Sequence, residues 1–584
     1  MGLFLAAALV HVAAGDNLLA NPGFESGLEP WRVSTREVAM EAAQTGGRRA
    51  ARIRVPDEAA VGFPLLFQER AVEGGEVFRA SVEAMGRGIR DGYGAYMSCE
   101  FRDGAGTRLS FVQTPPASVG GAWENLQCRM VVPPGAATLR VCLLLNGHGE
   151  AWFDDAVLEA LPRLDARPLD GPVTLTVSAE PTAAPLIGFG AEDDGWFYNP
   201  ENAAHGVTEA DWAIREGRID WMDPDYVRMF VWYKDWNPSG DWETFTFDSA
   251  NMASHYRTLD QYQRLGARLN VTGVEWAMED PYGDPARAAR GIGALFEHLI
   301  RTKGYTCVRD WTLTNEPNGH FKRSGYPFER YVELHERVKE EFARRGLDVS
   351  VVGSDDTAGY SWFQQCVESD AYFQTADYFA SHRYFQYPDR VFAPFFFDDR
   401  LSLLAARDPV KPLVVAEFGF QDARSDALEN PLMESYPYAV WTTAFVIEGL
   451  NRGVAGFSIW CLHEVYYPGN GFMNYGLWDY KDNDWKPRPV YHAAAMFSRL
   501  TEAGDRVRPC SSSHPGHVLG AVAGDTLFWV NRGEEPAEVR VAGFAPATMC
   551  VMTEATLEGD RECGVEATYR ESFTAPPMSF GYAR

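Results

Sequence analysis

The sequence predicts a multidomain protein in which a (β/α)8 barrel, or TIM barrel, is flanked by an N-terminal β-sandwich of jelly-roll type and a small C-terminal β-sandwich. Three observations lead to this prediction. At 584 residues the chain exceeds what one hydrophobic core usually organises. Its central part alternates short apolar runs with amphipathic helical patterns. Its two ends consist of short alternating segments broken by Gly, Pro and Asn.

Composition shifts along the chain set the expected boundaries. Residues 1–15 are an apolar run that ends in small residues and lacks Lys and Arg, and they predict a signal peptide and a secreted or periplasmic protein. The expected domains are a β-sandwich at 16–161, a linker with one strand of the C-terminal sandwich at 162–183, the barrel at 184–500 and the C-terminal sandwich at 501–584. No later segment offers about 18 uninterrupted apolar residues, so no membrane span is expected.

The central part contains eight apolar runs, each followed by a helical or loop segment. Eight such units over roughly 300 residues are typical of a (β/α)8 barrel. The predicted strands are Ile187–Ala191, Val227–Val231, Ala267–Val274, Asp310–Thr314, Val349–Gly353, Tyr378–His382, Leu413–Glu417 and Gly456–Cys461.

Charge and aromatic content restrict the possible partners. The chain carries 53 Lys and Arg against 81 Asp and Glu, a net charge of -28 that repels phosphate backbones, so nucleic-acid binding is not expected. The 17 Trp, 25 Tyr and 35 Phe suit the apolar faces of sugar rings, although large β-rich cores also use them. Nine cysteines without CxxC spacing indicate no metal site, and Cys550 with Cys563 is one pair that an oxidising compartment would permit.

Two glutamates follow apolar runs at positions where a barrel builds its active site. Glu316 closes the fourth predicted strand in the run Trp311–Pro317, and Glu417 closes the seventh in Leu413–Gly419. Burial next to a second carboxylate would separate their pKa values. Glycoside hydrolysis needs such a pair, with retention at a separation of about 5 to 5.5 Å and inversion at about 6.5 to 9.5 Å.

The Asn315-Glu316-Pro317 motif together with Glu417 resembles clan A of the glycoside hydrolases, and the match covers the barrel, over half of the chain. The resemblance implies retention, with Glu316 as acid/base, Glu417 as nucleophile and Asn315 as donor to the 2-hydroxyl of the sugar. It also implies supporting roles for an arginine that keeps the nucleophile ionised, a His-x-Tyr pair that orients the site and a tryptophan platform, at Arg228, His382, Tyr384 and Trp460.

Other polar and aromatic residues also follow predicted strands. Glu275 and Trp276 come after the third strand, and we expect them to bind or support the substrate. Further acidic residues are interpreted as acceptors for sugar hydroxyls or as loop caps: Glu192, Asp193, Asp194, Asp355 and Asp356. Neither a metal-ligand set nor a phosphate loop accompanies them, so no catalytic cofactor is expected.

The N-terminal region opens with Asn17-Leu18-Leu19-Ala20-Asn21-Pro22-Gly23-Phe24-Glu25 and closes with Trp152-Phe153-Asp154-Asp155-Ala156-Val157-Leu158. Both ends resemble jelly-roll carbohydrate-binding modules. The resemblance implies a structural calcium held with the help of Glu25 and Asp155. The same sandwich also serves as a spacer, so sugar binding by this region stays open.

Together these features predict a glycoside hydrolase that cleaves β-linkages in a polysaccharide or oligosaccharide through a covalent glycosyl-enzyme. A binding module is more useful on a polymer, which favours an endo-β-glucanase. Three alternatives remain: an exo-acting β-glycosidase, a transglycosylase on the same residues, and a non-catalytic carbohydrate-binding protein.

Overall fold

The computed structural model describes residues 17–584, except residues 36, 118–119, 134, 162–167, 277, 320, 322–323, 358–359, 468, 470, 558 and 560–563. The predicted signal peptide and Cys563 therefore lie outside the described residues. The chain divides into two compact units, residues 1–165 and residues 166–584. Each unit is described by itself.

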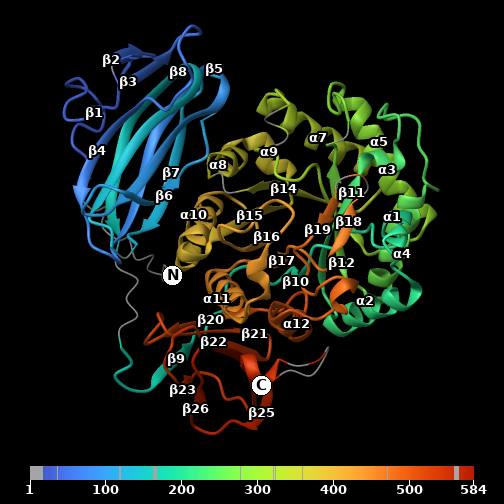
Figure 1. Ribbon diagram of the computed structural model, residues 1–584. Helices are drawn as coiled ribbons and strands as arrows, with labels where there is room; N and C mark the ends of the chain where they lie inside the picture. Colours follow the sequence, from blue (N-terminus) through green and yellow to red (C-terminus); the bar gives the residue numbers. More distant parts are fainter. Residues whose placement is uncertain are drawn as a thin grey trace, which may run out of the picture. The chain divides into compact units, whose positions relative to one another are not determined.

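Unit 1 is a β-sandwich (Figure 1). Its strands are β1 (Arg32–Val33), β2 (Ala39–Thr45), β3 (Arg48–Val55), β4 (Leu65–Ala71), β5 (Val77–Arg102), β6 (Arg108–Gln113), β7 (Glu124–Val131) and β8 (Thr138–Leu161).

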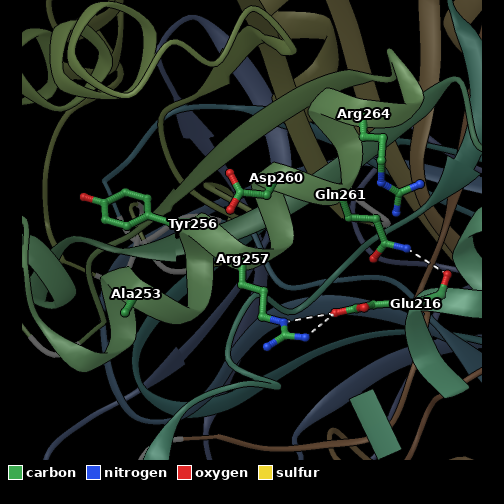
Figure 2. Close-up of a pocket in the computed structure, with 7 residues that line it drawn as sticks. All are labelled: Glu216, Ala253, Tyr256, Arg257, Asp260, Gln261 and Arg264. Atoms are coloured by element: carbon green, nitrogen blue, oxygen red, sulfur yellow. Dashed lines mark hydrogen bonds and ion pairs between the residues drawn. The ribbon is translucent and has the colours of Figure 1, made fainter. Parts of the chain in front are cut away.

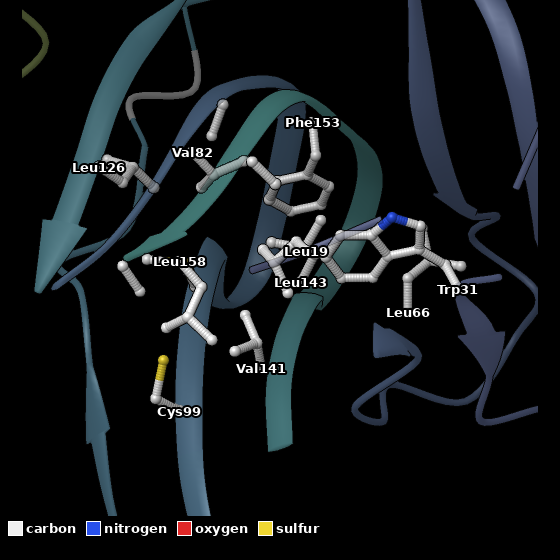
Figure 3. Packing of buried hydrophobic residues seen from close by; sticks show 14 of the residues in the cluster. Leu19, Trp31, Leu66, Val82, Cys99, Leu126, Val141, Leu143, Phe153 and Leu158 are labelled. Carbon is white, nitrogen blue, oxygen red and sulfur yellow. The ribbon is translucent and has the colours of Figure 1, made fainter. Parts of the chain in front are cut away.

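The two longest strands of unit 1 build both of its layers. The first half of β5 pairs with β7 and with the second half of β8, whereas its second half pairs with β6 and with the first half of β8. The register of the β5–β8 ladder shifts between Arg87 and Arg90 and between Arg90 and Gly94, where both strands change layer. The apolar side chains that point between the layers form the core shown in Figure 3.

Unit 2 contains a barrel of eight parallel strands (Figure 1). In chain order they are β10 (Gly188–Ala191), β11 (Tyr226–Trp232), β12 (Arg268–Val274), β13 (Val308–Thr312), β14 (Ser350–Thr357), β15 (Tyr378–Gln386), β16 (Leu413–Gln421) and β17 (Gly456–Ile459). Each overlaps one of the eight predicted strands.

The barrel closes around its first strand. β10 pairs in parallel with β17, and a parallel bridge between Glu192 and Arg228 joins the end of β10 to β11. Each strand therefore has two neighbours, and inward side chains such as Tyr226, Val352 and Val414 fill the interior. The C-terminal ends of all eight strands consequently meet at one mouth.

The connections between the strands supply the helices. The α-helices are α1 (Pro200–Ala204), α2 (Glu209–Met222), α3 (Tyr233–Trp236), α4 (Ala250–Leu265), α5 (Pro285–Glu297), α7 (Phe328–Arg345), α8 (Tyr360–Glu368), α9 (Asp370–Thr375), α10 (Ala393–Ala405), α11 (Tyr436–Arg452) and α12 (Pro489–Leu500). There is also one short π-helix, η1 (His298–Thr302). The short 3-10 helices are η2 (Tyr387–Phe392), η3 (Pro431–Glu434), η4 (Lys481–Asn483) and η5 (Glu554–Thr556).

Local chemistry sets the ends of these helices. Ser249 caps α4 by accepting a hydrogen bond from the backbone N–H of Met252. Gly266 then ends α4 with a φ of 77°, and Gly346 ends α7 with a φ of 63°, a conformation that glycine adopts without a Cβ clash.

A nine-stranded sheet completes unit 2. Its strands are β9 (Val173–Val177), β20 (Val507–Ser512), β21 (Val518–Ala523), β22 (Thr526–Asn531), β23 (Ala537–Ala542), β24 (Thr548–Met552), β25 (Val565–Thr568), β26 (Phe573–Ala575) and β27 (Ser579–Ala583). β9 precedes the barrel in the chain and pairs with β20 and β23. A separate hairpin, β18 (Val465–Tyr467) with β19 (Gly471–Met473), follows the last barrel strand.

Several strand ends differ from the sequence prediction, and two of these differences affect the placement of the candidate glutamates. β13 ends at Thr312, so Asn315 and Glu316 lie in a turn beyond the strand. β16 continues to Gln421 because its parallel pairing with β15 runs on as far as Gln386, so Glu417 lies inside the strand. Among the described residues, no helix is long and apolar enough to span a membrane.

Candidate active site

Glu417 is anchored at the mouth of the barrel by an arginine from β11. Arg228 Nη1 donates a hydrogen bond to Glu417 Oε1 at 2.6 Å, and the exposed fractions of the two side chains are 0% and 7%. The other oxygen, Oε2, accepts a longer hydrogen bond of 3.4 Å from Tyr384 Oη. One oxygen of Glu417 is thus held firmly, while the other is held loosely.

Glu316 lies on the turn after β13 and is more accessible. Its backbone is left-handed, with a φ of 47°, and its side chain is 26% exposed. His382 Nδ1 lies 3.2 Å from Glu316 Oε1 and 3.6 Å from Glu417 Oε2. His382 therefore sits between the two glutamates.

The two carboxylates approach each other closely. One oxygen of Glu316, one ring nitrogen of His382 and one oxygen of Glu417 all lie within 4.8 Å of one another. A retaining pair of carboxyl groups lies about 5 to 5.5 Å apart, and this close approach of single oxygens is compatible with that spacing.

Asp355 connects the cationic groups around the pair, which was not foreseen from the sequence. Its Oδ2 accepts from Arg228 Nη2 at 2.7 Å and its Oδ1 lies 3.0 Å from His382 Nε2. Asp355 is fully buried and has a left-handed φ of 55° at an irregularity in the β14–β15 ladder. Because both oxygens are occupied, the interpretation of Asp355 as a sugar-hydroxyl acceptor or loop cap is replaced by a structural role beneath the pair.

A second buried pair lies next to Asp355. Asp356 accepts from Ser354 Oγ at 2.9 Å and from Arg400 of α10 at 3.0 Å, and Arg400 also donates to Ser381 Oγ at 2.6 Å. Ser381 directly precedes His382, so Arg400 ties the two strands that carry Asp355 and His382. The sequence held no signal for Arg400, because its partners lie far from it along the chain.

The charges around His382 determine its proton affinity. Burial alone would lower its pKa, but the negative charges of Glu417 and Asp355 and the hydrogen bonds to Asp355 and Glu316 raise the pKa of His382 to about 10. His382 is therefore an imidazolium near neutral pH.

The imidazolium acts on both glutamates. Burial raises the pKa of Glu316, but the hydrogen bond and charge of His382 outweigh it and hold the pKa below its ordinary value. For Glu417 burial prevails over the charges of His382 and Arg228, and its pKa lies above the ordinary value. His382 thus lowers the proton affinity of both carboxylates.

The acidic run after β10 points into the protein interior. Asp193 is buried and accepts from Arg215, from Tyr262 Oη at 2.6 Å and from His463 at 2.9 Å. Glu192 and Asp194 are also buried, and burial raises the pKa of Asp194 to about 8. With exposed fractions of 0 to 1%, these three residues do not reach solvent, which corrects their interpretation as sugar-hydroxyl acceptors.

Aromatic rings extend from the buried arginine towards solvent. The guanidinium of Arg228 lies 4.8 Å from the ring centre of Phe230, whose centre is 5.2 Å from Trp460 and 6.2 Å from Trp276. Phe230 and Trp460 are 2% and 8% exposed, whereas Trp276 is 39% exposed. Trp276 thus offers the accessible ring of this series.

Glu275 lies beside the turn that carries Glu316. Its Oε2 accepts from Thr314 Oγ1 at 2.6 Å and from Tyr282 Oη at 3.3 Å. Burial raises the pKa of Glu275 to about 7. Glu275 therefore retains a proton over much of the acidic range.

A surface cavity lies away from these residues. A hollow of about 530 Å³ between α2 and α4 is lined by polar side chains, including Glu216 and Arg257, which form an ion pair at 2.9 Å (Figure 2). None of the candidate site residues lines it.

The two residues predicted to hold calcium lie in unit 1. A Cβ added at Gly23 would lie 3.6 Å from an oxygen of Asp154 and 3.6 Å from one of Asp155, so both carboxylates point at this glycine. Burial, followed by the charges of Asp155 and Glu25, raises the pKa of Asp154. Among the described residues Glu25 and Asp155 do not belong to a group of three close ligand side chains, and the calcium site stays a prediction.

Several solved structures are similar in fold to most of this chain. A family 30 endoxylanase from Clostridium papyrosolvens is similar with a TM-score of 0.52 and 12% identity over 70% of this chain and 99% of that chain. The catalytic domain of a family 30 xylanase from Talaromyces cellulolyticus has a TM-score of 0.53 and 13% identity over 70% and 99%. An endo-β-1,6-glucanase has a TM-score of 0.51 and 14% identity over 70% and 94%.

Searches at the level of sequence add nothing to these likenesses. No protein-family model matches the chain, and no curated protein matches it. At identities of 12 to 14% the solved structures establish the fold. The chain therefore has the barrel fold of glycoside hydrolases that its resemblance to clan A predicted.

Proposed function

We propose that this protein is a retaining β-glycoside hydrolase that cleaves a polysaccharide internally, with Glu417 as nucleophile and Glu316 as acid/base. The observation that carries the proposal is the close approach of two carboxylates, within 4.8 Å, at the mouth of a (β/α)8 barrel. A pair at this separation suits attack by one carboxylate on the anomeric carbon while the other protonates the leaving oxygen.

The contacts of Glu417 favour it as the nucleophile. Arg228 holds Oε1 at 2.6 Å, which leaves Oε2, with its longer contact to Tyr384 at 3.4 Å, as the attacking oxygen. Attack forms a bond from Oε2 to the anomeric carbon and displaces the glycosidic oxygen. The Arg228 guanidinium stabilises the carboxylate charge of Glu417 before attack and again when hydrolysis of the glycosyl-enzyme regenerates it.

The position of Glu316 favours it as the acid and then the base. It is the more exposed of the two, with 26% of its side chain accessible against 7% for Glu417, and an acid must be able to reach the departing oxygen of a bound glycoside. After the leaving group departs, Glu316 takes a proton from water, which attacks the glycosyl-enzyme and releases the sugar with its configuration retained. The side-chain amide oxygen of Asn315, Oδ1, accepts a hydrogen bond from Arg228 Nη2 at 2.8 Å. The N–H groups of the same side-chain amide are therefore available to the 2-hydroxyl of the sugar.

The proton affinities of the ligand-free site run opposite to these roles, because His382 lowers the pKa of Glu316 and burial raises that of Glu417. A glycosidic oxygen that hydrogen-bonds to Glu316 in place of His382 removes the interaction that keeps Glu316 ionised. The roles of Glu417 and Glu316 therefore follow from the contacts of Glu417 and the exposure of Glu316.

Endo-cleavage of a β-glucan-type polymer is the favoured mode. Three structures that share the fold are named as an endoxylanase, a xylanase and an endo-β-1,6-glucanase. An exo-acting β-glycosidase and a transglycosylase would use the same residues, and a non-catalytic binding protein would use none of them for chemistry. We further propose that unit 1 binds the polymer and that the protein is secreted or periplasmic.

The deciding experiment offers defined β-linked glucans, xylans, mannans and galactans to the wild-type protein, to Glu417→Gln and to Glu340→Gln, which changes an exposed glutamate of α7. We expect oligosaccharides of retained configuration from wild type and Glu340→Gln, and none from Glu417→Gln at unchanged circular dichroism. Near wild-type turnover by Glu417→Gln would refute the assignment. Products lengthened by an added acceptor would instead identify a transglycosylase.

A further inference from the structure

Two cysteines of unit 1 lie on facing layers of the sandwich. Cys128 of β7 is opposite Ala80 of β5, which is opposite Leu158 of β8. Cys99 comes from the other half of β5 and is opposite Val141 of β8. All five side chains belong to or pack against one core cluster. The row Cys128–Ala80–Leu158 therefore faces the pair Cys99–Val141 across the interior of the sandwich. Figure 3 shows the Cys99 sulfur beside Leu158 and Val141.

The two thiols are neighbours in this core. The Cys128 side chain interacts with the Cys99 thiol and raises its pKa, and neither cysteine is in a disulfide in this structure. Cys99 is fully buried, whereas Cys128 is partly exposed. An oxidant in solution therefore reaches Cys128 first.

A third cysteine nearby points the other way. Cys142 follows Val141 by one residue, and successive side chains of a strand alternate between faces. Cys142 accordingly belongs to a different apolar cluster, with Tyr96 and Leu144. It is a matched cysteine that lies close to the pair in sequence and space without sharing its face.

We propose that Cys99 and Cys128 form a disulfide that joins the two layers of the N-terminal sandwich. The oxidant is a small-molecule or protein disulfide. The Cys128 thiolate attacks one of its sulfurs and expels a thiolate; the Cys99 thiolate then attacks Cys128 Sγ of the mixed disulfide and expels the second. Two protein thiols lose two protons and two electrons, and the oxidant is reduced to two thiols. Immunoglobulin-type sandwiches use an inter-sheet disulfide in the same way.

The environment of Cys99 controls the rate of closure. Its hydrogen bond with Cys128, followed by burial, holds the pKa of Cys99 well above the usual range. Little thiolate is therefore present in the folded unit, and the second step is slow at neutral pH. Closure should accelerate as the pH is raised.

The bond would stabilise the folded state of unit 1. It closes the chain between Cys99 and Cys128 in the unfolded state and so reduces the entropy of that state. We expect oxidation to raise the Tm of the unit 1 transition on the order of 5 to 10 °C.

The test uses the full-length protein equilibrated with oxidised and reduced glutathione. After remaining thiols are blocked in denaturant, a non-reducing peptide map should contain a Cys99–Cys128 linked peptide that disappears on reduction. This map of the wild-type chain decides the pairing without any variant. A Cys142-containing linked peptide, or a glutathione adduct on Cys128 with Cys99 still free, would overturn the proposal.

Variants supply a second measurement. Calorimetry of the full-length protein should show the oxidation-dependent rise in Tm for wild type and Cys142→Ala, and no rise for Cys99→Ala or Cys128→Ala. An equal rise in Cys128→Ala would contradict the pairing. The glycoside hydrolase assignment is not involved in any of these outcomes.

Discussion

Arg228 and Glu417 form a buried ion pair at 2.6 Å, and the same guanidinium also binds Asp355 at 2.7 Å. One cation thus serves two buried carboxylates from different strands. Removing it leaves both carboxylates without that partner in a region where charge is poorly solvated. The catalytic proposal and the stability of the barrel mouth therefore both depend on Arg228.

Replacing Arg228 by Met should destabilise unit 2 and alter its pH profile. Loss of one partner of a buried pair costs about 3–5 kcal/mol in the free energy of unfolding. The pKa of Glu417 should rise, since Arg228 lowers it, and the acidic limb of activity should move to higher pH. Guanidinium unfolding and a pH series measure the two effects. The control Arg264→Met changes an exposed arginine and should alter the free energy of unfolding by less than about 0.5 kcal/mol. Equal losses of unfolding free energy in both variants would contradict the role of Arg228 as the buried partner of two carboxylates.

Replacing Glu316 by Ala should affect substrates according to their leaving groups. A natural glycoside needs protonation of its leaving oxygen, and loss of a general acid costs about 10²–10⁴-fold in rate. An aryl glycoside with an acidic phenol needs little protonation, so its kcat/KM should fall far less. Steady-state kinetics on both substrates check this, and equal losses on both would argue against Glu316 as the acid.

Replacing His382 by Asn should move both limbs of the pH–activity profile upward. The imidazolium lowers the pKa of both Glu316 and Glu417, so both values rise when it is removed. Both limbs of a kcat/KM profile report the ionisation of this carboxylate pair in the free enzyme, so both should move when the pair binds its protons more tightly. The pH–activity profiles of the wild type and of His382→Asn, each normalised to its maximum, measure the two shifts. A shift of only one limb, or a downward shift, would contradict the position of His382 between the two glutamates.

His382 should also make stability depend on alkaline pH. Its folded pKa of about 10 lies above the unfolded value of about 6.5, so its contribution is fully present below the unfolded value and is lost as pH rises through about 10. The free energy of unfolding of the wild type should therefore fall over that window more steeply than that of His382→Asn. Denaturant titrations at several pH values measure the difference, and parallel curves would be inconsistent with a charged His382.

Replacing Trp276 and Trp460 by Ala should have different effects. Trp276 is 39% exposed, so its loss should raise KM about 3- to 10-fold with little change in stability, as expected for a ring that stacks on sugar. Trp460 is 8% exposed and packs on Phe230, so its loss should lower stability by about 3–5 kcal/mol. Kinetics and unfolding of both variants separate the effects. An unchanged KM for Trp276→Ala would remove it from the substrate site.

The sequence alone was sufficient to predict the barrel strands and to propose two glutamates at their ends. Strand formation depends on local runs of apolar residues, and a polar residue directly after such a run must lie near the mouth of a parallel barrel. That reasoning led to Glu316 and Glu417, whereas Arg228, His382 and Tyr384 were implied by the resemblance to clan A. The structure brings all five together.

The tertiary structure decided what local pattern could not. Asp355 and Asp194 both follow strands as acidic residues, yet the irregular register of β14 turns Asp355 towards Arg228 and His382, while Asp194 is buried against Tyr467. The contact between Cys99 and Cys128 likewise depends on β5 changing layers at its register shifts. Pairing register and side-chain direction depend on contacts between residues far apart in the chain, and a linear pattern does not contain them.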